Sequence, residues 1–208
     1  MSQVVAETED TVQDVSHRRT YWTMLVSSIF SLTASLVLSV DAIKLAENPG
    51  AKLACNINAI VSCGKVAKSW QSSLLGFPNS FIGLICEPVV ITLAIASLGG
   101  SRFPRWFMRT ALGVYFAGLL FAFWLFSQSF FVIKAFCPWC VLVTITTITV
   151  FSSMLRIHVL DELLPFSEQF RAKLRSKFLA GWDNVAVVAL FSAIAIAVMA
   201  KYGSSIFG

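Results

Sequence analysis

Five long apolar runs, separated by polar stretches, dominate the hydrophobic pattern of this chain. The runs cover Tyr21–Val40, Ser80–Leu98, Trp106–Phe126, Ile133–Leu155 and Val185–Ala200. An α-helix rises about 1.5 Å per residue, so a run of roughly 20 residues crosses the hydrocarbon core of a bilayer, which is about 30 Å thick. The pattern therefore predicts an all-α integral membrane protein with five spans, of which the last is the shortest.

The polar stretches divide the chain into parts. We expect an N-terminal tail at 1–20, a four-helix transmembrane bundle at 21–157 with a long outer loop at about 46–79, an interfacial amphipathic helix at 158–182, and a fifth transmembrane helix with a short outer tail at 183–208. The interfacial helix is indicated by apolar residues at helical spacing opposite basic ones, namely Phe166, Phe170, Leu174 and Phe178. The outer loop is too apolar to lie free in water, so we expect residues 58–73 to be partly helical and to cover the bundle as a lid.

Composition excludes an ordinary soluble domain. Hydrophobic residues make up 57% of the 208 positions and charged residues only 13%, and the mean hydropathy is +0.76. In such a chain the net charge of +5 indicates topology rather than nucleic-acid binding. All eight arginines and two lysines lie in the N-terminal tail and the even-numbered connections, and six lysines lie on the other side. The rule that positive loops stay inside therefore predicts a cytoplasmic N-terminus and an outer lid loop.

The N-terminal segment is not expected to be removed. Met1–His17 is polar and acidic, and the first span after it lacks a small-residue cleavage site. These features argue against a cleaved signal peptide. The first span is therefore expected to stay in the membrane.

The motif Cys137-Pro138-Trp139-Cys140 carries the clearest chemistry. It places two thiols one helical turn apart at the start of an uncharged apolar run. Pro138 fits the first turn of a helix, which makes Cys137 the predicted N-cap. A thiolate there is stabilised by free backbone N–H groups and by the positive helix end, so we expect a redox-active pair. A structural disulfide and half of a zinc site are the alternatives.

A second pair of cysteines lies in the predicted lid. Seven residues separate Cys55 from Cys63, a spacing that would let the pair exchange with two partners in turn. A zinc site made of all four cysteines is one alternative, although the gap suits zinc poorly. Two permanent structural disulfides that staple the lid are another.

Taken together, these motifs resemble the bacterial branch of the vitamin K epoxide reductase family from about Tyr21 to Leu155. The likeness rests on Cys55, Cys63, Val66, Ser69-Trp70, Pro78-Asn79-Ser80 and Cys137-Pro138-Trp139-Cys140. The resemblance implies a four-helix bundle around a quinone electron acceptor, menaquinone or ubiquinone, with no metal. It also implies a thioredoxin-like partner, which many bacterial members carry after a fifth span. This chain ends after its fifth span, so we expect a separate, secreted, DsbA-like partner.

The resemblance assigns roles to individual residues. Cys55 would meet the partner, Cys63 would relay to Cys137, and Cys140 would face the quinone. Asn79 and Ser69 would lie near the quinone ring. Alternatively, Asn79 is only a helix N-cap and Ser69 only a cap or a solvated residue of the lid. Some family members have tyrosine four residues after the second membrane cysteine, where this chain has Thr144. This departure leaves epoxide handling and inhibitor sensitivity open.

One carboxyl falls inside a predicted span. Glu87 lies two turns into the second apolar run and precedes Pro88, and a charge at that depth is costly unless it is paired or protonated. It is a candidate proton relay. The alternative is a neutral carboxyl hydrogen-bonded to a backbone carbonyl near Pro88 or to serines of the first span. The fifth cysteine, Cys86, is expected to pack as a small apolar residue.

The sequence thus leads to one main hypothesis. We expect a membrane thiol–disulfide oxidoreductase of the bacterial cell membrane that oxidises a partner's dithiol outside the membrane, reduces a quinone and supports disulfide formation in exported proteins. A quinone or vitamin K epoxide reductase serving quinone recycling is the first alternative. A non-catalytic membrane scaffold with structural disulfides is the second.

Overall fold

The computed structural model describes residues 2–56 and 60–207 and is built from helices joined by short connections. The long helices are α1 (Ser2–Glu47), α3 (Ser80–Leu98), α4 (Arg105–Ser127), α5 (Pro138–Leu160) and α7 (Trp182–Phe207), and the short elements are α2 (Cys63–Ala67), α6 (Glu168–Leu179), the 3₁₀ turn η1 (Trp70–Ser73) and the π-helical turn η2 (Gln128–Ile133). Within the described residues, five helical segments are long and apolar enough to cross a membrane. The prediction of an all-α membrane protein with five spans is confirmed.

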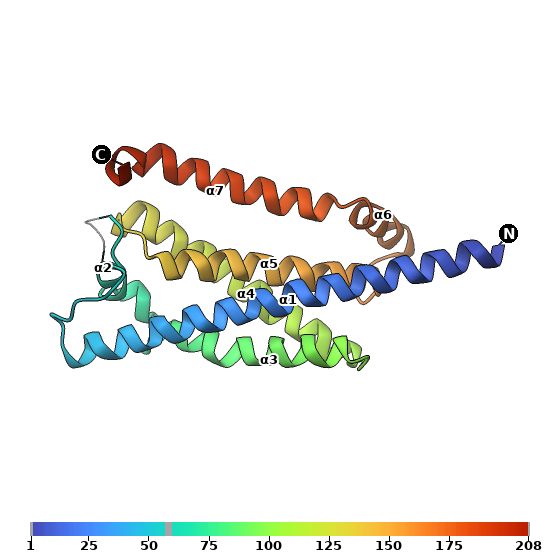
Figure 1. The fold of residues 1–208 in the computed structure, drawn as a ribbon, viewed down its shortest axis with the longest axis horizontal. Coiled ribbons are helices and arrows are strands. Elements are labelled where there is room, and N and C mark those ends of the chain that lie inside the picture. The colour runs from blue at the N-terminus through green and yellow to red at the C-terminus, as the bar shows by residue number, and fades with distance from the viewer. Residues whose placement is uncertain (1, 57–59, 208) are drawn as a thin grey trace.

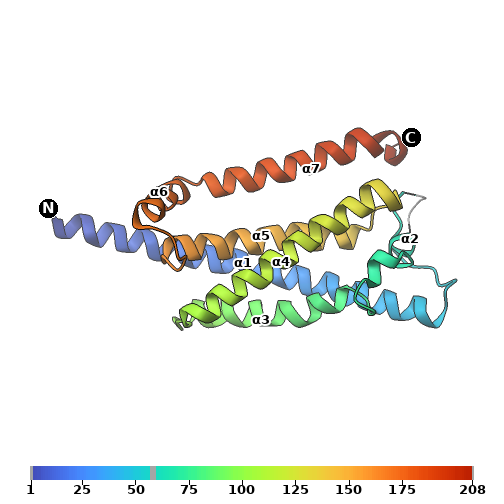
Figure 2. The ribbon, with the colours of Figure 1, turned by 180° about the vertical axis from the view of Figure 1, so that it is seen from behind.

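Four of the long helices form a bundle. Helix α1 packs against α3 and α5, and α4 packs against α5 (Figure 1). Helix α7 runs along the edge of the bundle and is joined to it through α6 (Figure 2). Helix α2 and the starts of α3 and α5 lie at one end of the bundle, which we call the cysteine end, and α6 lies at the opposite end. The expected four-helix bundle with a fifth span is therefore present.

Small residues let α1 and α3 approach each other closely. Ser31, Ser35 and Ser39 are buried along one face of α1. A Cβ atom added to Gly83 of α3 would lie 2.1 Å from Ser35 Oγ and 2.9 Å from Ser35 Cβ, so only glycine fits at this contact. Close backbone approach of this kind is a common means of helix association in membranes.

The connection between α4 and α5 differs from the pattern of apolar runs, in which the third run ends at Phe126 and the fourth begins at Ile133. Helix α4 continues through η2 to Ile133 and ends at Lys134, whose φ of 53° is left-handed. Residues 135–137 are extended, and α5 begins only at Pro138 rather than at Ile133. The reason is local, because a proline disfavours helical backbone in the residue before it and fits the first turn of a helix.

The lid loop is partly helical, as predicted. It contains α2 and η1, which are joined to each other through Lys68 and Ser69. Residues 57–59, where the predicted segment begins, lie outside the described residues. The described part of the lid lies at the cysteine end of the bundle, as the views in Figures 1 and 2 show.

The expected interfacial helix at 158–182 is shorter in the structure. Helix α5 extends to Leu160, Glu162 has a left-handed φ of 52°, and Pro165 precedes α6. A proline removes a backbone donor and disfavours helix in the residue before it, so the segment cannot form one continuous helix. The fifth helix is longer than the predicted run, since α7 begins at Trp182 directly after Gly181.

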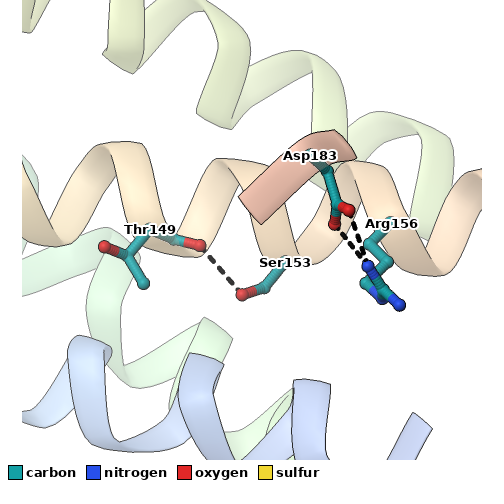
Figure 3. Close-up of polar contacts among 4 residues, drawn as sticks. All are labelled: Thr149, Ser153, Arg156 and Asp183. Carbon is teal, nitrogen blue, oxygen red and sulfur yellow. Dashed lines mark hydrogen bonds and ion pairs between the residues drawn. The ribbon is translucent and has the colours of Figure 1, made fainter. Parts of the chain in front are cut away.

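An ion pair ties α7 to the bundle. Arg156 Nη1 of α5 lies 2.7 Å from Asp183 Oδ1 and 2.6 Å from Oδ2, as Figure 3 shows. The side chain of Asp183 is only 5% exposed. At the other end of α7, the Tyr202 hydroxyl donates to the Phe130 carbonyl at 2.8 Å. The fifth helix is thus attached to the bundle at both ends.

Candidate active site

The two cysteines of the lid are bonded to each other. Cys55 and Cys63 form a disulfide, and Cys63 opens α2 with Ser62 as its N-cap. The Ser62 hydroxyl accepts a hydrogen bond from the Lys65 backbone N–H, and Asn56 Oδ1 accepts one from the Gly64 N–H. These bonds satisfy donors at the start of the short helix, where the chain itself offers no acceptors. They fix the backbone on both sides of Cys63.

Backbone pairing docks the lid onto the segment that precedes α5. The Phe136 N–H donates to the Ile60 carbonyl at 2.7 Å, and the Ser62 N–H donates to the Phe136 carbonyl at 2.9 Å. The extended backbone at residues 135–137, which Pro138 favours, leaves both Phe136 groups available for this contact. As a result Cys63 Sγ lies 3.1 Å from Cys137 Sγ. The sulfur atoms of two separate pairs are therefore in contact.

Cys137 is the N-cap of α5, as predicted. Its sulfur accepts a hydrogen bond from the Cys140 N–H at 3.4 Å, and Pro138 occupies the first turn. The Cys140 thiol is the largest influence that lowers the pKa of Cys137, and the backbone N–H groups of Cys140 and Trp139 add to it, whereas burial and the Asp41 carboxylate oppose it. The net effect lowers the pKa of Cys137, so this thiol is the better nucleophile of the membrane pair.

Cys137 and Cys140 are free thiols in this structure. With the disulfide in the lid, the cysteines are in the state in which the lid pair is oxidised and the membrane pair is reduced. A four-cysteine zinc site does not fit this arrangement, because the disulfide occupies two of the sulfur atoms. In the part of the chain that the structure describes, no group of three or more His, Cys, Asp or Glu side chains is placed to hold a metal ion.

A large cavity opens beside the membrane pair. Its volume is about 780 Å³, and its wall is mostly apolar. The polar side chains that reach it include Cys140, Asn79, Ser69, Glu87 and Thr144. Ligand pockets in proteins combine such apolar walls with a few polar groups, at volumes of about 300–1,000 Å³. Thr144 lines the cavity, as do six of the predicted site residues, namely Cys63, Ser69, Asn79, Glu87, Cys137 and Cys140.

Asn79 occupies the N-cap position of α3 but does not act as its cap. Its Nδ2 donates to the Gln71 carbonyl at 2.7 Å, and among the described residues its side chain makes no capping bond. Its Oδ1 is buried and has no hydrogen-bond partner in residues 2–56 and 60–207. The side chain of Asn79 therefore does not cap α3 by a hydrogen bond. Asn79 lines the cavity with a half-buried side chain, whose Oδ1 is buried and whose amide N–H is bonded to the lid.

Ser69 has a structural contact in the lid. Its hydroxyl donates to the Val66 carbonyl at 2.6 Å and so closes the turn between α2 and η1. The residue also lines the cavity. Both sequence interpretations, a lid cap and a residue near a ring, are compatible with this position.

Glu87 is hydrogen-bonded across the bundle. The Ser31 hydroxyl of α1 donates to Oε1 at 2.7 Å, and the Tyr115 hydroxyl of α4 donates to Oε2 at 2.8 Å. The predicted contact with serines of the first span is therefore present. Tyr115 was not among the residues singled out in the sequence. The clue in the sequence was that Tyr115 is the one tyrosine in a span rich in phenylalanine. A buried tyrosine hydroxyl usually has a hydrogen-bond partner.

Asp41 is a second acidic group near the thiols that the sequence motifs do not identify. Its Oδ2 lies 3.8 Å from Cys55 Sγ. The residue ends the membrane-facing part of α1, and sequence position alone gave no reason to place it beside a cysteine 14 residues later. A carboxylate at this distance disfavours a thiolate on Cys55.

Comparisons with known proteins agree with this site. The sequence model of the vitamin K epoxide reductase family matches residues 22–155, which include all four paired cysteines and Asn79. A search of curated proteins finds no match. The family is linked to quinones in general and works with thioredoxin-like partners. Because the match covers most of the chain and its bundle carries the two cysteine pairs, this protein belongs to the vitamin K epoxide reductase family of membrane oxidoreductases.

Proposed function

We propose that this protein passes electrons from a separate, secreted, thioredoxin-fold partner of the DsbA type through Cys55 and Cys63 to Cys137 and Cys140, and from there to a quinone. The process would support disulfide formation in exported proteins. The observation that carries the proposal is the 3.1 Å separation of Cys63 Sγ and Cys137 Sγ. Two sulfur atoms from different pairs have no structural need to touch, whereas exchange between pairs requires it.

The thiol chemistry follows a chain of exchanges. A partner thiolate attacks Cys55, Cys63 leaves, and the partner's second thiol releases the partner as a disulfide. The Cys63 thiolate then attacks Cys137 of an oxidised membrane pair, and Cys140 leaves. Attack of Cys55 on Cys63 releases Cys137 and restores the lid disulfide. The membrane pair is then reduced by two electrons. The structure has this last arrangement of bonds.

Partner access requires the lid to move. Cys55 is 8% exposed and Cys63 only 2%, so neither sulfur is open to a folded partner in this arrangement. The lid carries exposed apolar side chains nearby, including Trp70 and Leu75, which are 63% and 57% exposed. Apolar surface of this kind is typical of contacts with another protein or with lipid. We expect the partner to bind there and to displace the lid.

The cavity suits a quinone. Its volume fits a ring with part of an apolar tail, and the buried Asn79 amide, whose Oδ1 has no partner within the described residues, offers polar contacts at its cysteine end. A bound menaquinone or ubiquinone would supply an acceptor for two electrons and two protons. Cys140 lines the same cavity, which would place the leaving thiol of the membrane pair beside that acceptor.

The arginine distribution supports an orientation in the bacterial cell membrane. Arg105 begins α4 and Arg156 lies near the end of α5, both at the end of the bundle opposite the cysteine end, and Arg18 lies at the start of the first membrane-spanning part of α1. Positive loops stay in the cytoplasm. The N-terminus would then be cytoplasmic and the cysteine end would face the outside. Disulfide exchange is expected in that oxidising compartment.

The test is turnover by the purified protein. A reduced thioredoxin-fold dithiol and a soluble quinone are added, and quinone reduction is followed for wild type, for Cys140→Ala and for Thr92→Val. Thr92 is exposed on α3 and lies outside the cavity, so this variant controls for a change in a span. We expect dithiol-dependent reduction in wild type and Thr92→Val and its loss in Cys140→Ala.

Two other results would favour the alternatives. If several dithiols and quinones give no turnover while the cysteines stay paired, the stapled scaffold becomes the better description. If the protein turns over but cells lacking it still form disulfides in exported proteins, its purpose is the reduced quinone.

A further inference from the structure

We propose that Glu87 donates a proton to the quinone bound in the cavity, with Tyr115 and Ser31 as the positioning residues that hold its carboxyl. This inference rests on the function proposed above and extends it to the inner part of the site. Helix α3 would then contribute an acidic side chain to the quinone site, in addition to apolar wall residues.

The first observation is position. Glu87 is 4% exposed, yet it lines the cavity that also holds Cys140 and Asn79. It follows Asn79 by eight residues on α3, which corresponds to about 12 Å along the helix axis. Side chains of a helix lean toward its N-terminus, and α3 begins at the cysteine end, so the Glu87 side chain leans back toward the thiols. A ring bound beside Cys140 would therefore share one cavity with the amide of Asn79 and the carboxyl of Glu87.

The second observation is the way the carboxyl is held. Each oxygen meets one hydroxyl, Ser31 Oγ at 2.7 Å and Tyr115 Oη at 2.8 Å, and all three residues are buried. Hydroxyl groups both donate and accept. The cluster can therefore bond a protonated carboxyl and can also stabilise the carboxylate that remains after the proton has left.

The third observation is the proton count. The hydrogen bonds at the N-cap lower the pKa of Cys137 and so favour the form of the reduced membrane pair that holds one thiolate and one thiol. Its oxidation to a disulfide releases two electrons and one proton, whereas a quinone takes up two electrons and two protons to become a quinol. The second proton comes from the Glu87 carboxyl, which becomes a carboxylate. Atoms and charge then balance, since the Cys137 thiolate carries one negative charge before the reaction and the Glu87 carboxylate carries one after it.

Serine hydroxyls lie on the face of α1 between the cysteine end and Glu87. Ser39 Oγ donates to Ser80 Oγ at 2.9 Å near the cysteine end, and Ser35 lies one turn from Ser31 on the same face of α1. Ser35 and Ser80 also line the cavity. The dithiol that reloads the membrane pair brings two protons. One remains on Cys140, and the other restores Glu87 through the cavity that Ser35 and Ser80 line.

The experiment follows a single turnover in infrared difference spectra. Protein with a reduced membrane pair is mixed with a soluble quinone in H₂O and in D₂O. We expect a carboxylic acid C=O band, shifted in D₂O, to lose intensity as the quinol forms, and we expect Glu87→Gln to lack this band. General acids contribute about 10²- to 10⁴-fold, so Glu87→Gln should form quinol at least about 10²-fold more slowly. It should still bind quinone, as measured by quenching of tryptophan fluorescence.

Three further variants sharpen the test. Tyr115→Phe keeps the acid and removes one hydroxyl, so the band should remain but shift in frequency. Glu87→Asp should shift the band and restore part of the rate, and it replaces the glutamine variant if that protein does not fold. Thr92→Val, on the same helix but outside the cavity, should match wild type in both readouts.

The proposal is overturned if the wild-type band stays constant while quinol forms, or if folded Glu87→Gln reduces quinone at the wild-type rate. Either result leaves the thiol relay intact. Failure of wild type to form any quinol would instead overturn the proposed function, so the two failures are distinguishable.

Discussion

Replacing Cys140 should trap a mixed disulfide between the lid pair and the membrane pair of cysteines. In Cys140→Ala the Cys137 thiolate can attack Cys63, form a Cys63–Cys137 disulfide and release Cys55, but no second membrane thiol remains to resolve this mixed disulfide by attacking Cys137. The two sulfur atoms lie 3.1 Å apart, within the separation of about 3–3.5 Å that is typical of near-attack geometry. Because the contact is already made, we expect capture without large rearrangement of the lid.

Comparison of Cys140→Ala with Cys140→Ser gives the expected size of the difference in exchange rate. The Cys140 thiol is the largest cause of the lowered pKa of Cys137. Serine keeps a side-chain donor at this position and alanine removes it, while the backbone N–H bond at 3.4 Å remains in both. A hydrogen bond to a charged group contributes about 1.5–3 kcal/mol. At the lower end of this range, about 1.5 kcal/mol, the alanine variant should exchange on the order of tenfold more slowly than the serine variant at neutral pH.

The sign of the pH dependence follows from the lowered pKa. The Cys137 thiolate persists to lower pH when a donor faces it, so capture in Cys140→Ser should continue at pH values where capture in Cys140→Ala has already failed. Raising the pH should bring the two variants together, since Cys137 is then ionised in both.

Alkylation of the released Cys55 provides the assay. A maleimide blocks this thiol and makes the capture irreversible, which overcomes the tendency of Asp41, 3.8 Å away, to disfavour the free thiolate. Peptide mapping should then recover a Cys63–Cys137 disulfide with modified Cys55. The double variant Cys137→Ala/Cys140→Ala is the control and should keep only Cys55–Cys63. If both serine and alanine variants also keep only Cys55–Cys63 over the whole pH range, the contact between the pairs does not serve exchange.

Three further changes test how the fold supports the site. Gly83→Ala should destabilise the protein by about 1–3 kcal/mol, because overpacking forces α1 and α3 apart, and Ser35→Gly should restore part of the loss in thermal unfolding; an unchanged midpoint for Gly83→Ala would contradict the close contact. Arg156→Gln should cost about 3–5 kcal/mol by leaving the buried Asp183 unpaired and should expose the α6–α7 segment to protease, and adding Asp183→Asn should reverse much of this effect; equal protease resistance in all three proteins would refute it. Phe136→Pro removes the N–H bonded to the lid and should reduce capture between the two cysteine pairs in the Cys140→Ser background, whereas unchanged capture would show that lid pairing is not needed.

Properties that depend on a short stretch of chain were predictable. The five spans follow from the length of the apolar runs, because crossing the bilayer requires a fixed number of helical residues. The N-cap role of Cys137 follows from Pro138, whose ring restricts both itself and the residue before it. The same restriction explains why the predicted start of the fourth span at Ile133 was too early. Hydropathy does not reflect the backbone restriction that proline imposes. The apolar residues that follow Lys134 keep the average hydropathy high, so the interruption of the helix at residues 134–137 does not show in the pattern.

The sequence by itself determined that this chain is a helical membrane protein with two cysteine pairs, one of them at the head of a span. Only the tertiary structure decided that Cys63, 74 residues before Cys137, touches that cysteine and that Tyr115 reaches Glu87. Helical periodicity tells which residues share a face, but it leaves open how each helix is rotated and which helix it meets. Those choices depend on side-chain packing across the bundle, as at Gly83 and Ser35, and they are made jointly by residues distant in the chain.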